Sequence, residues 1–386
     1  MLAKILGFLV LVPVLHAQDG PAKPDIHVSG TILTNGFYTS ASVNNSDVPT
    51  FVTPSASSGF PAHSLGGTIR QTQVRVTGTL AGIAGGDLHA ELETDFFGGQ
   101  QPSGGGRTHP LLRVRRAFFE MTWPSVSLLI GQEAPPIVGV NPSSVASLGF
   151  PEFASAGNLW LWLPQVRVTG RLTRGTGARF AVEGALLVPN EGTPQDAFTT
   201  QPDLAERSGR PNIEGRILAQ WGGDDTFGEL SVGGHLGWLA TNGDSLIDSK
   251  AVAVSVRAPL LRWLEVRGEV FTGQALAGLG GGGIGQNLGV NGVPVETTGG
   301  WAQIILRRGA RWEAGVGMGL DDPKNADVDS LTGRQKNTVS AVHLIWRPSP
   351  LLFGLEYRHL ETTYGTGPLG GARQANHVNL AAGFEF

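Results

Sequence analysis

The sequence predicts an all-β fold, a transmembrane antiparallel up-and-down β-barrel of about sixteen strands. Three observations lead to this prediction. Segments of about ten residues alternate between apolar and polar side chains, as strands with two unlike faces do. Long and short connections alternate between these segments along the chain. The charged residues of each segment keep to one of its two faces.

The last segment, residues 374–386, shows the alternation most clearly. Its apolar face consists of Val378, Leu380, Ala382, Phe384 and Phe386. As the last strand of a soluble sandwich, it would be an exposed edge that invites aggregation. In a closed barrel it has neighbours on both sides, and its apolar face meets lipid. A final amphipathic strand that ends in Phe also resembles the C-terminal signature of bacterial outer-membrane barrels, which implies recognition by the barrel assembly machinery.

The N-terminus has the features of a secretory signal peptide over residues 1–17. Lys4 precedes an apolar stretch over residues 5–15, and Ala17 is a small residue before the expected cleavage site. Residues 18–386 are then predicted to form a single outer-membrane barrel domain. The absence of cysteine excludes disulfides, cysteine metal sites and a lipid anchor on cysteine. No run of about 18 apolar residues occurs, which excludes a helical membrane protein.

Seven strands are predicted in the first half of the chain, each bounded by Gly, Pro, Asn or Ser clusters. They are residues 26–39, 69–81, 88–97, 111–122, 126–133, 165–174 and 179–188. The short turns after the second and fourth strands cover residues 82–86 and 123–125. Longer loops cover residues 40–67, 98–110 and 134–163.

Nine further strands are predicted in the second half, with the same order of turns and loops. They are residues 213–221, 227–240, 251–258, 262–274, 300–307, 311–320, 338–347, 352–361 and 374–386. An even number of strands returns both chain ends to one side of the membrane. Short periplasmic turns and longer extracellular loops are typical of barrels in the bacterial outer membrane.

The aromatic residues predict belts at the two membrane interfaces. All nine tryptophans fall in turns, in loops or near the ends of predicted strands, where an apolar ring with one polar N–H is favoured. Trp263 and Trp301 share their phase with charged residues, so they either face inward or lie beyond the strand. The residues predicted at the interfaces are Trp123, Trp221, Trp238, Trp312, Trp346, Phe384 and Phe386.

The charged strand residues predict a water-filled lumen. A Lys or Arg on the lipid face costs about 2–4 kcal/mol at mid-membrane, so the charged face is expected to point inward. A sixteen-stranded barrel is wide enough for an aqueous channel, which predicts passage of small polar solutes. The residues predicted to line the channel and its constriction are Arg75, Arg113, Arg115, Arg167, Arg171, Glu91, Glu93, Asp95 and Glu152.

Two interpretations of these arginines remain open. Either they form a constriction that favours anions, or they pair with Glu91, Glu93 and Asp95 and hold the wall. The proline-rich loop 134–163 is long enough to fold into the lumen. Arg116 breaks the alternation of its strand, which indicates either a β-bulge or a position at a subunit interface.

No residue pattern indicates an enzyme, a cofactor or a nucleic-acid partner. The nine histidines show no metal-ligand spacing, and the net charge of −4 comes without a basic domain. An Asp-rich segment, residues 321–336, is expected to be a solvated loop, with Ca²⁺ binding as the alternative. The sequence therefore predicts no metal site.

Three stretches resemble the DcaP-like porins of Gram-negative bacteria. They are RQTQVRVTG (70–78), LETDFFGG (92–99) and LRVRRAFFEM (112–121), the last followed by LLIGQ (128–132). The resemblance implies an outer-membrane homotrimer that passes small anions, dicarboxylates among them, through a channel lined by Arg75, Arg113 and Arg115. Some members carry a coiled coil before the barrel. Here only residues 18–24 intervene, so no such extension is expected. The alternatives are a barrel with a blocked lumen, acting as an adhesin or specific transporter, and an outer-membrane enzyme.

Overall fold

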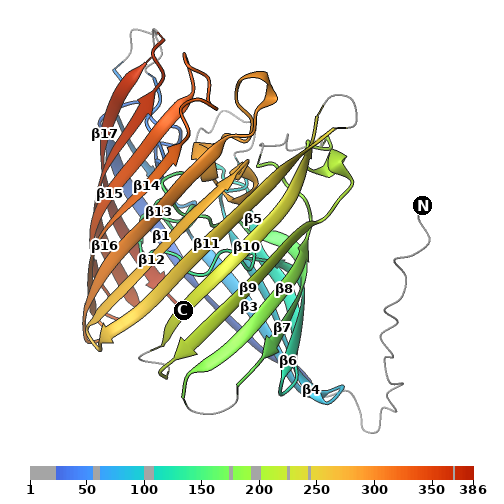
Figure 1. Cartoon of the computed structure of the whole chain (residues 1–386). Coiled ribbons are helices and arrows are strands. Elements are labelled where there is room, and N and C mark those ends of the chain that lie inside the picture. Colours follow the sequence, from blue (N-terminus) through green and yellow to red (C-terminus); the bar gives the residue numbers. More distant parts are fainter. Residues whose placement is uncertain are drawn as a thin grey trace.

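The protein, described by a computed structural model, is a closed antiparallel β-barrel (Figure 1). The structure describes residues 23–54, 61–99, 108–173, 177–192, 201–223, 227–241, 245–367 and 370–386. All strands belong to one sheet, which closes where the first strand pairs with the last. The predicted fold class is therefore confirmed. The predicted signal peptide, residues 1–17, lies outside the described residues.

The sheet contains seventeen strands. They are β1 (Asp25–Thr39), β2 (Ser64–Thr68), β3 (Gln73–Ile83), β4 (Gly86–Asp95), β5 (Arg113–Thr122), β6 (Val126–Glu133), β7 (Leu163–Arg171), β8 (Arg179–Leu187), β9 (Asn212–Trp221), β10 (Gly228–Ala240), β11 (Leu246–Leu261), β12 (Leu264–Gln274), β13 (Glu296–Arg308), β14 (Trp312–Pro323), β15 (Arg334–Trp346), β16 (Leu351–Tyr364) and β17 (Gly371–Glu385). No helix among the described residues has the length and apolar character needed to cross a bilayer.

β2 and β3 share one position in the barrel, so the seventeen strands fill sixteen positions. β2 pairs with the end of β1 and β3 with its beginning. Between them, the Thr72 hydroxyl bonds to the backbone N–H (3.0 Å) and carbonyl (3.1 Å) of Leu33. These side-chain bonds take the place of backbone hydrogen bonds between neighbouring strands. The chain can therefore form a turn over residues 69–72. The predicted strand over residues 69–81 was therefore wrong at its start.

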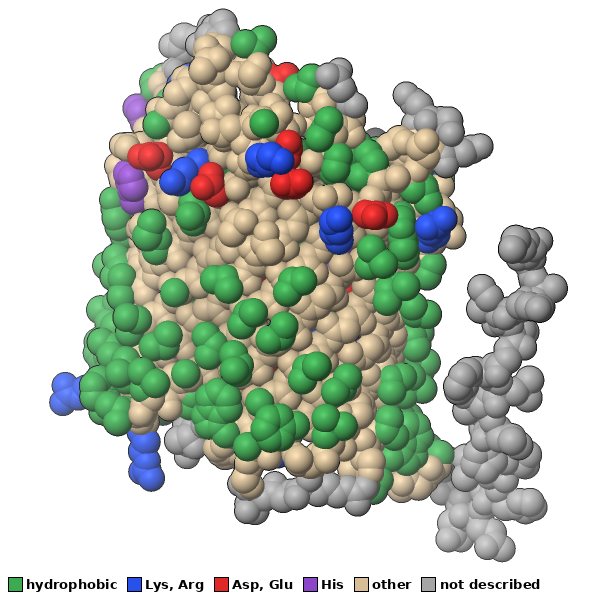
Figure 2. All heavy atoms as spheres, in the orientation of Figure 1, with side chains coloured by type: hydrophobic (Ala, Val, Ile, Leu, Met, Phe, Trp, Pro, Cys, Tyr) green, Lys and Arg blue, Asp and Glu red, His purple; other side chains and the backbone are tan. Residues whose placement is uncertain are grey.

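The two faces of the sheet are inverted relative to a soluble protein. On the outer face, Ile304, Val316 and Val342 lie side by side on neighbouring strands and are about half exposed. On the inner face, residues such as Asn379 and His377 are buried. Figure 2 shows a band of hydrophobic side chains on the outer wall, with acidic and basic side chains gathered above it. The last strand has the predicted faces, with Leu380 outside and Asn379 inside.

Turns and loops alternate between the two ends of the barrel, as predicted (Figure 1). Their lengths do not always differ in the predicted way. The connection over residues 241–245 belongs to the loop end, yet it is shorter than the turn between β7 and β8, residues 172–178. The end of the barrel at which a connection lies thus follows from the order of the strands, and the length of the connection is a weaker guide to it.

Most of the predicted interface aromatics lie near the end of the barrel that carries the short turns, which we call the turn end; the opposite end is the loop end. Trp312 stacks on Trp346, whose ring stacks in turn on Phe353, with centroids 5.7 and 5.5 Å apart. Phe384 and Phe386 form a second stacked pair at 6.3 Å. Trp123 and Trp221 also adjoin short turns, whereas Trp238 lies near the loop end of β10.

Trp301 does not belong to a belt. It lies in the middle of β13 and is only 3% exposed, because its ring faces inward and stacks on Phe153 at 5.9 Å. Trp160 is likewise buried inside the barrel. The expectation that all nine tryptophans mark turns or strand ends was wrong for Trp301, whereas the alternative that it faces inward is correct.

We predict that Val316→Arg lowers the free energy of unfolding by about 2–4 kcal/mol, because the outer face at this height is apolar. Urea unfolding from lipid vesicles measures the change. Val316→Leu, which keeps the side chain apolar, is the matched control and should unfold nearly as the wild type does. A variant with arginine that is as stable as the control would contradict an outward orientation of this face.

Candidate channel constriction

The segment between β6 and β7, residues 134–162, lies inside the barrel; we call it the inward loop. Its backbone N–H groups at Ile137, Ser143 and Leu159 donate to wall side chains on β9, β13 and β12. Its carbonyls accept from wall amides, including Asn35 on β1 at 3.2 Å and Asn337 on β15 at 2.7 Å. Contacts to strands on all sides place this loop across the lumen, as the green trace in Figure 1 also shows.

Two further loops pack against the inward loop. The β12–β13 loop, residues 275–295, buries Leu276 and Leu279 against Leu159 of the inward loop. Val52, which precedes β2, joins a second cluster with Phe153 and Trp301. These apolar clusters lie inside the barrel against β11, β12, β13, β15, β16 and β17. Packed side chains therefore occupy the lumen along one side.

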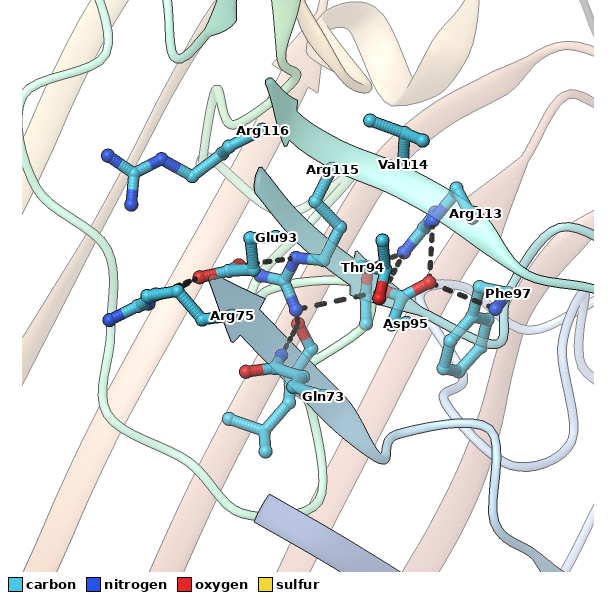
Figure 3. Close-up of polar contacts among 12 residues, drawn as sticks. Gln73, Arg75, Glu93, Thr94, Asp95, Phe97, Arg113, Val114, Arg115 and Arg116 are labelled. Atoms are coloured by element: carbon cyan, nitrogen blue, oxygen red, sulfur yellow. Dashed lines mark hydrogen bonds and ion pairs between the residues drawn. The ribbon is translucent and has the colours of Figure 1, made fainter. Parts of the chain in front are cut away.

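The predicted arginines of β3 and β5 lie together in an ion-pair network with acids of β4 (Figure 3). Arg75 pairs with Glu93 and approaches Glu91 at 3.3 Å. Arg113 donates to Asp95, with Nε 3.0 Å from Oδ1. Arg115 lies 3.0 Å from Glu93 and 3.7 Å from Asp95. Each of these arginines is thus neutralised by a neighbouring carboxylate, as in the interpretation that they hold the wall.

Arg116 lies in a β-bulge, one of the two arrangements predicted for it. Glu93 pairs with Arg116 and the next residue, Thr94, pairs with Val114, so Arg115 is an extra residue in β5. Figure 3 shows Val114 pointing away from the arginines beside it. The bulge turns Arg115 and Arg116 to the same face. Arg116 there pairs with Glu133 and with Glu91, the latter at 2.6 Å.

Aromatic rings surround two of the paired arginines. The Arg115 guanidinium lies 4.6 Å from the Trp162 ring, and Arg113 lies between 5.1 and 5.6 Å from Phe97, Phe150 and Trp162. Arg113 and Arg115 also donate to the carbonyls of Gly149 and Leu148 in the inward loop. These arginines thus fix the loop to the β5 wall through charge, hydrogen bonds and ring faces.

The arginines of β7 have different surroundings. Arg167 lies between Leu129 and Ala185 in the strand register, and Arg171 lies opposite Ala181. Within the described ranges, they donate only to the backbone carbonyls of Ala134 and Trp123. Among the described residues, neither forms an ion pair, and the same holds for Arg179 on the inner face of β8. In this part of the structure, three cations without a described carboxylate partner therefore line one region of the wall.

Glu152 is buried at the point where the inward loop meets β16. It is 1% exposed, and Arg358, 2% exposed, lies between it and Glu356. Ser144 of the loop donates to Glu356 at 2.6 Å, and Gln303 donates to Glu152 at 3.1 Å. Glu152 is therefore part of the attachment of the loop to the wall.

A second arginine group, Arg257, Arg267 and Arg307 on β11 to β13, was not predicted from the sequence. All three approach one carboxylate, that of Glu265. Nothing in the sequence indicates that these three side chains lie together. Only the strand register brings them together.

The Asp-rich segment has no metal-site geometry. In the part of the chain described, no group of three His, Cys, Asp or Glu side chains is arranged to hold a metal ion. Asp321 accepts from Thr297 and from the Ile284 N–H, and Asp327 from the Glu296 N–H. The N–H groups of Thr332 and Leu331 hold the pKa of Asp329 below its ordinary value. The carboxylates of Asp321, Asp327 and Asp329 therefore hold nearby loop backbone in place by accepting its hydrogen bonds.

No protein-family model and no curated protein sequence matches the chain. Solved structures of similar fold are outer-membrane proteins. The outer-membrane channel DcaP of Acinetobacter baumannii has a TM-score of 0.71 at 16% identity, over 96% of this chain and 100% of that one. The anion-selective porin from Comamonas acidovorans gives 0.59 at 12%, over 94% and 100%. OmpT of Vibrio cholerae, in a trimer form, gives 0.53 at 10%, over 94% and 100%. The resemblance to DcaP is thus confirmed at the level of the fold.

We predict that Arg358→Met lowers the free energy of unfolding by about 3–5 kcal/mol, because two buried carboxylates lose their shared cation. Urea unfolding in detergent micelles, followed by tryptophan fluorescence, measures the loss. The control combines Arg358→Met with Glu152→Gln and Glu356→Gln, which removes the charges together and should restore most of the stability. Equal stability of Arg358→Met and wild type would show that the loop is not held by this ion pair.

Proposed function

We propose that the chain is a porin of the Gram-negative outer membrane that lets small polar solutes, and anions in particular, diffuse through its lumen. The fold supports this proposal, since solved structures similar to it include an outer-membrane channel and an anion-selective porin. The apolar outer face and the charged inner face of the sheet fit a barrel with lipid outside and water inside. A homotrimer is part of the proposal, supported by the trimeric form of OmpT.

The observation that carries the anion preference is the group of unpaired arginines on β7 and β8. A paired arginine adds little net field, whereas Arg167, Arg171 and Arg179 have no carboxylate partner among the described residues. A unit charge at 4 Å is worth about 1 kcal/mol in water, or roughly a five-fold change in the local concentration of an anion. These arginines therefore favour anions more than the paired group of β3 to β5 does. The proposal includes dicarboxylates among these anions only because the sequence resembles the DcaP-like porins.

The filled interior makes a blocked lumen the second candidate. The inward loop and the β12–β13 loop pack together over the β11 to β12 wall, and Val52 packs over the β15 to β16 wall. Such packing narrows any passage, which agrees with an adhesin or a specific transporter as well as with a narrow porin. Single-channel recording in planar bilayers distinguishes them. Regular current steps support the porin, and a silent, correctly folded barrel contradicts it.

We predict that Arg167→Gln with Arg171→Gln reduces the preference for anions, measured as the reversal potential across a KCl gradient. Each arginine contributes up to about five-fold in the local anion concentration, so the loss of two of the three should move the potential toward zero. The matched control, Arg116→Gln with Glu133→Gln, removes an ion pair without changing the net charge, leaves Glu91 beside Arg75, and should keep the wild-type potential. A cation preference of the wild type would contradict the anion proposal and leave a porin of the opposite selectivity.

A further inference from the structure

A small cavity lies between the inward loop and the wall formed by β10, β11 and β12. Its volume is about 300 Å³, and residues 139–142 of the loop form one side. Glu229, Arg257 and Arg267 line the wall side, with Phe227 beside them. This volume is at the lower end of the range for small-molecule sites. Acidic and basic side chains therefore line a cavity that is large enough for a small molecule.

Arg257 has fewer partners than its neighbours. Its guanidinium makes one ion pair, Nη2 to Glu265 Oε2 at 3.3 Å. The same carboxylate also serves Arg267 and Arg307. The Nε of Arg257 is buried and has no hydrogen-bond partner among the described residues. The Arg257 side chain as a whole is 34% exposed, so the rest of its guanidinium can donate to a ligand in the cavity.

Glu229 lies directly opposite Arg257 in the register of β10 and β11. Opposite charges in such a cross-strand pair normally attract each other. Here no ion pair joins the two within the described structure. Glu229 instead accepts from Gln220 at 2.8 Å and from Arg216 at 3.4 Å, both on β9. Because Arg257 turns toward β12, the two charges diverge, and both line the cavity.

The loop side of the cavity is held in place by the same wall. Arg267 donates from Nη1 to the carbonyl of Asn141 at 3.2 Å. At Gly139 the loop backbone passes so near the wall that a Cβ would collide with the hydroxyls of Ser231 and Ser255. The remaining lining, Val140, Pro142 and Phe227, is apolar. The cavity thus combines fixed charges of both signs with an apolar surface.

We propose that this cavity binds a small zwitterion of amino-acid size. The carboxylate of the ligand lies against Arg257 and Arg267, its ammonium group against Glu229, and its side chain against the apolar lining. A plain anion makes no contact with Glu229 through an ammonium group, and a plain cation makes none with the two arginines through a carboxylate, so a solute that carries both charges gains the most contacts. This inference rests on the proposed function, because solutes reach the cavity through the channel.

Three probes of nearly equal size test the proposal: alanine, lactate, which lacks the ammonium group, and alaninamide, which lacks the carboxylate. Block of the single-channel KCl current is measured against probe concentration for the full barrel in planar bilayers. We expect alanine to block at about ten-fold lower concentration than either analogue, since each charged hydrogen bond is worth about 1.5–3 kcal/mol. Arg257→Gln should weaken block by alanine about ten-fold, and Glu229→Gln should make alanine and lactate equivalent.

Arg308→Gln, at the exposed end of β13 and away from the cavity, is the matched control and should keep the wild-type order of the probes. Equal block of the wild type by alanine and lactate overturns the zwitterion site, as does an unchanged order of probes in Glu229→Gln, while the porin proposal stands. A wild-type barrel without KCl current overturns the proposed function itself. The wild-type comparison needs no substitution, so the test does not depend on the folding of a variant.

Discussion

The structure depends on one constraint, that a backbone in hydrocarbon must satisfy its own hydrogen bonds. A closed antiparallel sheet does so, because every strand has a neighbour on each side and the pairing of β1 with β17 leaves no edge. Closure also fixes the two faces, since alternate residues point outward and inward. The apolar outer wall and the charged inner wall both follow from this geometry. A shift of one residue in the pairing of a strand would turn its inner-face residues, charges included, to the outer face. The alternation in the sequence therefore fixes the register.

The same constraint acts inside the barrel. A loop that crosses the lumen carries backbone N–H and C=O groups away from bulk water, and these groups need partners. The wall supplies them through buried side chains, such as Glu214 for Ile137, Glu269 for Leu159 and Gln303 for Ser143. Many polar residues of the inner face therefore serve the inward loop. Polar character on that face is evidence of an interior lined by hydrogen bonds, and it does not by itself show that a residue meets solutes.

Much of the fold was predictable because it depends on periodicity. The strand positions and the inverted faces follow from residue spacing within single strands, and the spacing at Arg116 left a bulge as one of two alternatives. The break at residues 69–72 was not predictable, because it depends on bonds from Thr72 to β1 and from Gln71 to the inward loop. Trp301 was ambiguous for a related reason. Its ring faces the lumen and packs on Phe153 of the inward loop, a contact between residues far apart in sequence.

The candidate site shows the limit of sequence reasoning most clearly. Arg75 and Arg167 look alike in the sequence, as arginines on the charged face of a strand. Their chemistry differs because the strand register places Glu93 opposite Arg75 and places Leu129 and Ala185 beside Arg167. An arginine beside a carboxylate forms an ion pair with it, whereas Arg167 has no carboxylate partner among the described residues. The register decides which arginines are paired, and register is a property of pairs of strands that one strand's sequence does not contain.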